Sequence, residues 1–318
     1  MPKYERLKAY YEKVREQSAL AERGPSLEGK WRKFVDAMAR GRAAYGSALL
    51  GVCNVTPDSF SDGGTSFRFD DACARVQTLF DDGADVVDLG AESTRPGAAS
   101  VSASEQIARV VEVVRFAATK GPVSIDTANA EVADACLLAG ACVVNDVSCL
   151  ADSALARVVA SHDAALIVMH SRGSQTDMAG FGVYPENGYV HVLDEVVNEI
   201  NESVVRARAL GVRDEAIVVD PGFGFAKSRK HSLALLRHTA AFVKKLDRPV
   251  VIGASRKSFL AICDRESLPT ERIGASIAAA SWATRMGASM LRIHDVRATR
   301  QALLLEKTLQ SPEGGFCA

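Results

Sequence analysis

Long apolar runs, an excess of one charge and a leader-like N-terminus are all missing from this 318-residue sequence. No run of about 18 apolar residues occurs, so no membrane-spanning helix is expected. The N-terminal stretch is charged and lacks the apolar core of a signal peptide, which gives no reason to expect export. The 38 basic and 39 acidic side chains leave a formal charge of -1, so the composition implies no attraction to nucleic acid or membranes.

The sequence also lacks a sign of cysteine pairing, because the count is odd and no two cysteines have C-x-x-C spacing. The seven are Cys53, Cys73, Cys136, Cys142, Cys149, Cys263 and Cys317. We therefore expect a reduced protein in the cytoplasm. Aromatic residues make up only 6% of the chain, but hydrophobic residues make up 47%, enough for one large core or two modest ones.

A repeating unit begins at about residue 47: a short apolar run, a polar or Gly-rich turn, and a longer segment with helical spacing. We count eight such runs, at 47–54, 84–90, 122–126, 141–146, 165–170, 216–220, 249–255 and 289–294. The runs are β-branched and continuously apolar, which is typical of strands covered on both faces.

The segments between these runs are predicted to be helices. In 102–119 the apolar residues recur with helical spacing, and Ser102 with Glu105 forms a capping box. Glycines fall between a helical segment and the next strand, where a left-handed cap is favoured, at Gly83, Gly140, Gly211 and Gly287.

Alternating strands and helices predict parallel strands, and eight units over about 264 residues match a closed barrel. The expected fold is α/β, a (β/α)8 TIM barrel over 47–310, with a helical extension at 1–46 and a flexible tail at 311–318. A doubly wound open sheet is the structural alternative, disfavoured because no dinucleotide-type glycine fingerprint follows the first strand.

Nearly every predicted strand ends in a polar residue. These are Asn54, Asp88 with Glu92, Asp126, Asn145 with Asp146, His170, Asp220, Ser255 with Lys257, and Arg292 with His294. Any one of them could simply cap the following helix. In a parallel barrel, however, all these ends meet at one mouth, which is the predicted active site.

The residue types at this mouth indicate its ligand. Asp126, Asn145 and Asp220 suit the N–H groups of a flat heterocycle, and the lack of a His or Cys cluster argues against structural zinc. Cations at the strand ends indicate phosphate or pyrophosphate, unless some pair with nearby carboxylates: Arg95, Lys227, Arg256, Lys257, Arg292 and His294.

Two further features concern the mouth. Lys257 and Ser258 are expected to open the helix after the seventh strand, where a phosphate or a carboxylate would bind equally well. The Gly- and Ser-rich loops 56–67 and 92–100 are candidate lids.

Eight ordered motifs over 47 to about 305 resemble the dihydropteroate synthase family, whose fold is this barrel: NVTPDSFSDGG, DLGAESTRPGA, SIDT, VNDVS, MH..G, DPGFGFAKS, GASRKSF and RIHDV. The resemblance implies condensation of 6-hydroxymethyl-7,8-dihydropterin pyrophosphate with 4-aminobenzoate to give 7,8-dihydropteroate and pyrophosphate, in folate biosynthesis. It also implies Mg²⁺, no covalent enzyme intermediate, a homodimer and a sulfonamide target.

The resemblance assigns roles to individual residues. The pterin would be held by Asp126, Asn145, Asp220 and Lys257, and lined by Met169, Phe225 and Gly253. The pyrophosphate would be held by Arg95, Arg292 and His294, with its Mg²⁺ on Asn54. The aminobenzoate would contact Thr94, Pro96 and Ser258. The catalytic set implied is Asp126, Lys257, Arg292, His294 and Asn54.

Three other functions stay open at this point. A pterin-binding methyltransferase barrel would share the heterocycle pocket but has little need for the STRPG loop, Arg292 or His294. An aldolase would use Lys257 as a Schiff base, although this lysine is expected past the strand end and not in a desolvated pocket. A non-catalytic paralogue would keep the fold and lose turnover. The long N-terminal extension and the segment 174–192 depart from the family pattern.

Overall fold

The computed structural model describes residues 29–55, 69–91, 101–173 and 183–310. Several sequence predictions lie outside these ranges. They concern Glu92, Thr94, Arg95 and Pro96, the loops 56–67 and 92–100, the tail 311–318, residues 1–28 of the N-terminal extension and residues 174–182 of the segment 174–192. In the part of the chain that is described, no helix is long and apolar enough to cross a membrane.

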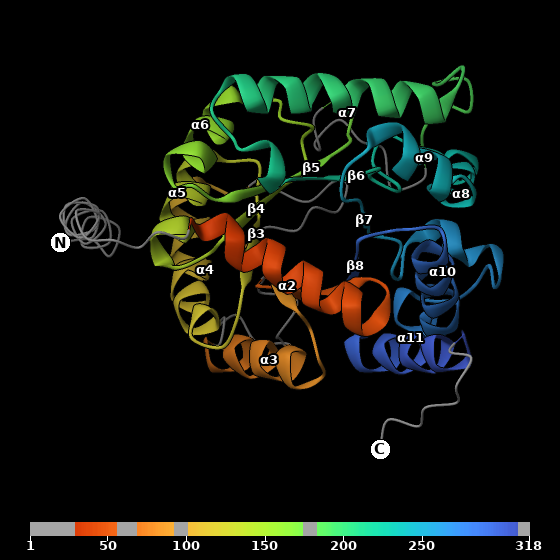
Figure 1. Ribbon diagram of the computed structural model, residues 1–318, viewed down its shortest axis with the longest axis horizontal. Helices are drawn as coiled ribbons and strands as arrows, with labels where there is room; N and C mark the ends of the chain where they lie inside the picture. The colour runs from red at the N-terminus through yellow and green to blue at the C-terminus, as the bar shows by residue number, and fades with distance from the viewer. Residues whose placement is uncertain (1–28, 56–68, 92–100, 174–182, 311–318) are drawn as a thin grey trace.

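Eight parallel strands form one nearly closed barrel (Figure 1). They are β1 (Ala48–Asn54), β2 (Val86–Gly90), β3 (Val123–Asp126), β4 (Val143–Asp146), β5 (Ala165–Met169), β6 (Ile217–Asp220), β7 (Val251–Ile252) and β8 (Met290–Ile293). Neighbours in sequence are neighbours in the sheet, β8 pairs with β1, and a single bridge between Val219 and Val250 joins β6 to β7. The TIM-barrel prediction is confirmed, and the open-sheet alternative is wrong.

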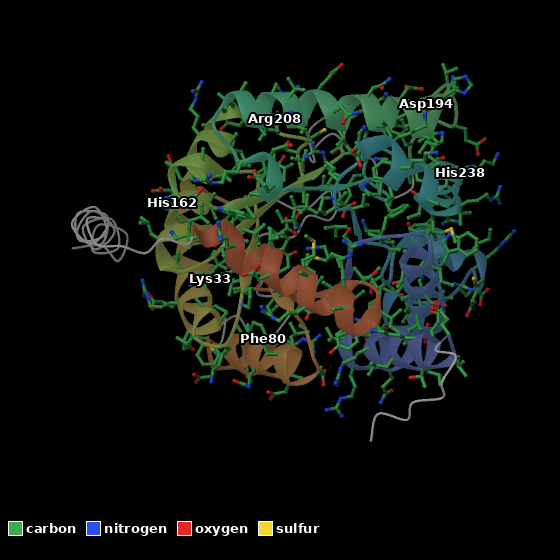
Figure 2. All side chains as sticks on the ribbon, viewed as in Figure 1. Lys33, Phe80, His162, Asp194, Arg208 and His238 are labelled. Atoms are coloured by element: carbon green, nitrogen blue, oxygen red, sulfur yellow. The ribbon has the colours of Figure 1, made fainter. Side chains whose placement is uncertain are left out.

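Helices surround the strands on the outside (Figure 1). They are α3 (Phe69–Asp81), α4 (Ala103–Ala118), α5 (Ala130–Ala139), α6 (Ser153–Ser161), α7 (Val192–Ala209), α8 (Arg229–Arg237), α9 (Thr239–Leu246), α10 (Ile273–Arg285) and α11 (Val296–Gln310). Short 3₁₀ turns are η3 (Asp214–Ala216), η4 (Ser258–Ile262) and η5 (Pro269–Glu271). Charged side chains such as Lys33, Asp194 and Arg208 lie on the outer surface (Figure 2).

The predicted helix ends are largely confirmed. The Ser102 hydroxyl accepts a hydrogen bond from the Glu105 amide at 3.3 Å, and all four inter-element glycines have positive φ. One start is wrong: no α-helix begins at Lys257, because Ser258–Ile262 form the 3₁₀ turn η4 and the next α-helix starts at Ile273. Within this turn Phe259 is buried, and its ring stacks on Phe223 with centroids 5.4 Å apart.

An additional helix, α2 (Lys30–Tyr45), lies across the amino-terminal end of the barrel (Figure 1). Its residues Phe34, Ala37 and Met38 are buried in one cluster with apolar side chains of the strands. Gly41 allows this close approach, because a Cβ there would lie 2.7 Å from the Ala48 Cα atom. The helix therefore closes the end of the barrel opposite to the predicted active site.

The barrel interior changes character along its axis. At the end near α2 it is filled by apolar side chains, including Leu50, Val86, Val143, Ile167, Val218, Val251 and Met290. Four of these strands carry a polar residue two positions further on, which therefore points to the same interior face. These residues are Asp88, Asn145, Asp220 and Arg292. The outward faces of the strands and the inner faces of the helices form a second, larger apolar cluster. The charged groups named here therefore gather toward the carboxyl end.

Candidate active site

An ion-pair cluster centred on Arg292 occupies the upper interior of the barrel. The guanidinium donates from Nε to Asp88 Oδ2 and from Nη2 to Asp126 Oδ2, both at 2.7 Å. Asn145 Nδ2 donates to the same Asp88 oxygen at 3.2 Å. Among the described residues, the other oxygens, Asp88 Oδ1 and Asp126 Oδ1, are buried without a hydrogen-bond partner. The cluster thus keeps unused acceptors, as a site for an N–H-rich ligand requires.

Burial shifts the titration of three groups in this mouth. It raises the pKa of Asp126 to about 7, more than the charge of Arg292 lowers it. It also raises the pKa of Asp220, against the opposing charge of Lys257. Desolvation lowers the pKa of Lys257 to about 8, opposed by Asp220. Two carboxyls and an amine shifted toward neutrality in one pocket are typical of a functional site.

An apolar surface lies beside these polar groups. Val147, Met169 and Phe225 form a small buried cluster separate from the two large cores. The Lys257 amine lies 4.8 Å from the centre of the Phe225 ring and donates to the Phe223 carbonyl at 2.5 Å. From the sequence, Lys257 was not expected in a desolvated pocket. This expectation is wrong, because desolvation lowers the pKa of its amine. A flat ring could contact the apolar surface while its edge meets the carboxylates.

The turn after β6 places these residues. Gly222, Gly224 and Ala226 have φ values of 68°, 81° and 44°. At Gly222 a Cβ would lie 2.0 Å from the His170 carbonyl oxygen, so only glycine fits. The Gly222 amide donates to Asp220 Oδ1 at 2.7 Å, which orients that carboxylate.

Gly253 keeps space open between two polar side chains. A Cβ at this position would lie 3.4 Å from Asp220 Oδ2 and 3.7 Å from the Arg292 Cβ. Alanine would fit at this position without a steric clash, but a larger side chain would fill the gap between the Asp220 carboxylate and Arg292. The role expected for Gly253, lining the ligand, stays a prediction.

His294 differs from the expectation that it is one of the cations. Burial lowers its pKa to about 3, and the nearby Arg292 and Arg256 act in the same direction, so the ring is neutral near pH 7. The Ser255 hydroxyl lies 3.1 Å from Nδ1. If that hydroxyl donates, the ring proton is on Nε2, which can still donate to an anion.

Other predicted mouth residues lie elsewhere. Lys227 and His170 are fully buried and bind each other behind the barrel wall. Asp146 accepts from the Ser148 and Leu150 amides and fixes the turn after β4. His170 and Asp146 follow Met169 and Asn145 directly, and successive strand residues point to opposite faces. Sequence spacing at a strand end does not show which of two neighbours points inward.

Arg256 pairs with a carboxylate, as Arg292 does, which was the alternative considered for the arginines. Its guanidinium binds Asp295 at 2.5 and 3.0 Å. Asn54 is exposed at the end of β1, and Ser258 is half-buried at the start of η4. Within the described residues no group of three His, Cys, Asp or Glu side chains could hold a metal.

Two members of the site had no role assigned from the sequence. The sequence places Asp88 among the polar strand ends. Its ion pair with Arg292 joins residues 204 positions apart, so no local pattern could predict it. Val147 lies two residues after Asn145. Since alternate residues of a strand point to the same face, this spacing could have predicted that Val147 also faces the mouth.

Comparisons with known proteins agree with this geometry. The family described as pterin binding enzyme matches residues 50–294. The dihydropteroate synthase of Escherichia coli K12 is 36% identical over 272 residues, which cover 83% of this chain and 93% of that protein. A probable bifunctional folylpolyglutamate synthase/dihydropteroate synthase of Haloferax volcanii is 38% identical over 252 residues, and this chain spans only 29% of its length.

A solved structure gives the same result. Xanthomonas albilineans dihydropteroate synthase with 4-aminobenzoic acid superimposes with a TM-score of 0.76 and 36% identity, covering 83% of this chain and 93% of that one. Fold and site define the class of pterin-binding barrel enzymes. Within that class the chain belongs to the dihydropteroate synthase family. The aldolase and corrinoid methyltransferase alternatives are therefore set aside.

Proposed function

We propose that this protein is a transferase that joins 6-hydroxymethyl-7,8-dihydropterin pyrophosphate to 4-aminobenzoate, releasing 7,8-dihydropteroate and pyrophosphate in folate biosynthesis. The observation that carries the proposal is the buried cluster of Arg292 with Asp88 and Asp126, which faces Asp220 and Lys257 across one mouth. The similarity to dihydropteroate synthases over most of the chain supports the same reaction.

The pterin is assigned to the deep part of the mouth. Asp126, Asn145 and Asp220 would accept or share the N–H hydrogen bonds along its edge, using the acceptors that remain on the carboxylates. Phe225 and Met169 would contact its face, and Gly253 leaves room for the ring. Lys257, near the Phe225 ring, would donate to a ring acceptor.

The pyrophosphate is assigned to the rim. Arg292, the neutral His294 and Arg95, which lies outside the described residues, would donate to it. Asn54 would contribute an exposed amide oxygen to Mg²⁺, and this fits because Mg²⁺ commonly takes one or two protein oxygens and completes its shell with phosphate and water. When bound, the ion would neutralise charge on the departing pyrophosphate.

The aminobenzoate is assigned to Ser258 together with Thr94 and Pro96, the latter two outside the described residues. The bond between the pterin methylene carbon and pyrophosphate would break first. The amino nitrogen of aminobenzoate would then intercept the cationic methylene and lose a proton, so no covalent enzyme intermediate is required. Sulfonamide analogues of aminobenzoate would compete for this subsite.

Assembly and location are further parts of the proposal. We place the protein in the cytoplasm, supported by the six described cysteines, all of which are free. A homodimer is supported by exposed apolar side chains on the adjacent helices α10 and α11, namely Ile273, Trp282, Leu304, Leu305 and Leu309.

Release of pyrophosphate tests the reaction. The purified protein is mixed with the pterin pyrophosphate and Mg²⁺, with and without 4-aminobenzoate, beside an Asp126→Ala variant. We expect release that depends on aminobenzoate and is lost in the variant. Binding of the pterin without release under any condition would overturn the proposal in favour of a non-catalytic paralogue.

A further inference from the structure

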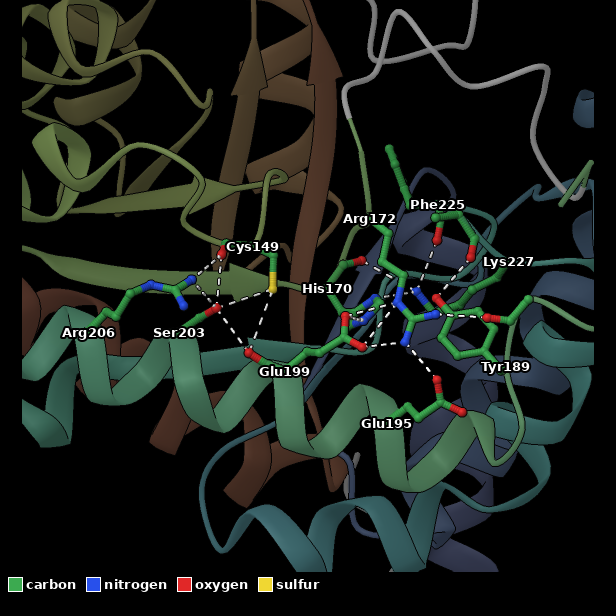
Figure 3. A network of polar contacts seen from close by, with 12 residues as sticks. Cys149, His170, Arg172, Tyr189, Glu195, Glu199, Ser203, Arg206, Phe225 and Lys227 are labelled. Carbon is green, nitrogen blue, oxygen red and sulfur yellow. Dashed lines mark hydrogen bonds and ion pairs between the residues drawn. The ribbon is translucent and has the colours of Figure 1, made fainter. Parts of the chain in front are cut away.

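A second polar network lies outside the mouth, between β5, α7 and the turn after β6 (Figure 3). His170 Nε2 lies 3.0 Å from a Glu199 oxygen of α7. Arg172 Nε donates to both oxygens of Glu199 at 3.0 Å, and Nη2 donates to Glu195 at 2.8 Å. The end of β5 is therefore fixed to two successive turns of α7.

Lys227 is the buried end of this network. Its side chain is fully buried, and its amine has an acceptor for each of its three N–H groups: His170 Nδ1 at 2.7 Å, the Phe225 carbonyl at 3.0 Å and the His170 carbonyl at 3.5 Å. Figure 3 shows the amine lying between His170 and the Phe225 carbonyl. Burial lowers its pKa to about 7, and the charge of Lys257 acts in the same direction. The buried amine does not enter the mouth, and two of its three partners are backbone carbonyls.

Tyr189 holds the next carbonyl from the same side. Its hydroxyl donates to the Ala226 carbonyl at 2.9 Å, and the Arg172 guanidinium lies 4.0 Å from the centre of its ring. Two successive carbonyls, those of residues 225 and 226, are thus bound from behind the barrel wall. Ala226 has a φ of 44°, a conformation that a non-glycine residue keeps only when its surroundings impose it.

The opposite side of this turn faces the mouth. The Phe225 ring belongs to the apolar surface there, and the Phe223 carbonyl accepts from Lys257. A shift of the turn would therefore move the ring and the Lys257 amine together. Displacements of about 1 Å are enough to weaken a pre-organised site by large factors.

We propose that Lys227, held by His170, whose ring is in turn bound by Glu199, is a positioning residue that fixes the strained turn 222–226 so that Phe225 and Lys257 meet the heterocyclic substrate. The inference rests on the proposed function, since the pterin is the ligand that Phe225 and Lys257 contact. Lys227 itself contacts no substrate. Its effect is confined to the part of the mouth built by the turn and does not extend to the aminobenzoate subsite.

Steady-state kinetics of a Lys227→Met variant tests this proposal. The control is Lys230→Met, three residues along the chain, whose amine is exposed and pairs with Glu186 at 2.7 Å. We expect the Lys227 variant to raise KM for the pterin pyrophosphate roughly tenfold or more, since it removes buried hydrogen bonds from a charged donor. KM for 4-aminobenzoate should change by less than about twofold, and the control should match wild type.

A Tyr189→Phe variant provides a second test that keeps the fold. This variant removes only the hydroxyl that donates to the Ala226 carbonyl. We expect KM for the pterin pyrophosphate to rise by less than in the Lys227 variant, roughly threefold. The inference is overturned if either variant leaves KM for the pterin unchanged, or if the folded Lys227 variant weakens both substrates equally. Failure of the wild-type protein to bind 6-hydroxymethylpterin would instead overturn the proposed function.

Discussion

At the scale of single residues, the site depends on ionisable groups whose pKa values burial brings close to 7 or 8. Asp126 has little access to solvent, and Arg292 compensates only part of the resulting desolvation. Lys257 is affected in the opposite sense by the same burial. A carboxylate is needed to accept N–H groups, and an ammonium is needed to donate. Activity should therefore be confined to the pH range in which both are charged.

The pH profile of kcat/KM for the pterin tests this view. The pKa of Asp126 is raised to about 7, so the acceptor form, and kcat/KM with it, should increase as pH rises through about 7. The pKa of Lys257 is lowered to about 8, so kcat/KM should decrease above about 8 as the proton is lost. In the residual activity of an Asp126→Asn variant, whose amide oxygen can still accept, the rising limb should be absent and the falling limb should remain. A rising limb that persists in this variant would assign it to another group.

Arg292 provides a second prediction at this scale. Its loss leaves the fully buried Asp88 without a counter-charge, which costs roughly 3 kcal/mol of unfolding free energy. Arg292→Gln should therefore lower both stability and turnover, the latter by about 10²-fold. Adding Asp88→Asn should recover much of the stability, measured by urea denaturation, but none of the activity. A double variant as unstable as the single one would contradict the ion-pair account.

At the scale of elements, the turn after β6 has little tolerance for change. Gly222 has a positive φ and lies against the His170 carbonyl, so Gly222→Ala should cost about 2 kcal/mol or more and weaken pterin binding. Gly274 in α10 is a matched control, because a Cβ there meets nothing within 4 Å. Gly274→Ala should leave stability unchanged or raise it by about 0.5 kcal/mol in thermal unfolding. Equal losses in both variants would show that the close contact is not the cause.

Elements were also the level at which sequence patterns were most informative. The eight apolar runs predict the eight strands, because a strand with helices outside and side chains inside must be apolar on both faces. The same patterns did not show whether His170 or Met169 points into the mouth, since they do not fix the direction of the last side chains of a strand. The polar partners of Lys227 come from β5 and α7, and no local pattern reports such contacts.

The whole molecule divides its barrel between stability and chemistry. Its lower interior is apolar and closed by α2, whereas the polar cluster lies above it. Substitutions in α2 should therefore affect folding and leave the mouth unchanged. Phe34→Ala, at a fully buried position, should cost about 3 kcal/mol in chemical denaturation while KM for both substrates stays within about twofold. A selective change in one KM would show that the two ends of the barrel are coupled.

The proposed reaction forms a bond in this mouth between the pterin methylene carbon and the nitrogen of 4-aminobenzoate. Mass spectrometry of the reaction products tests it most directly. We predict 7,8-dihydropteroate in equal amount to the pyrophosphate released, and neither product from the Asp126→Ala variant. Pyrophosphate accompanied only by hydroxymethyl-dihydropterin, the product of water attack, would contradict the account.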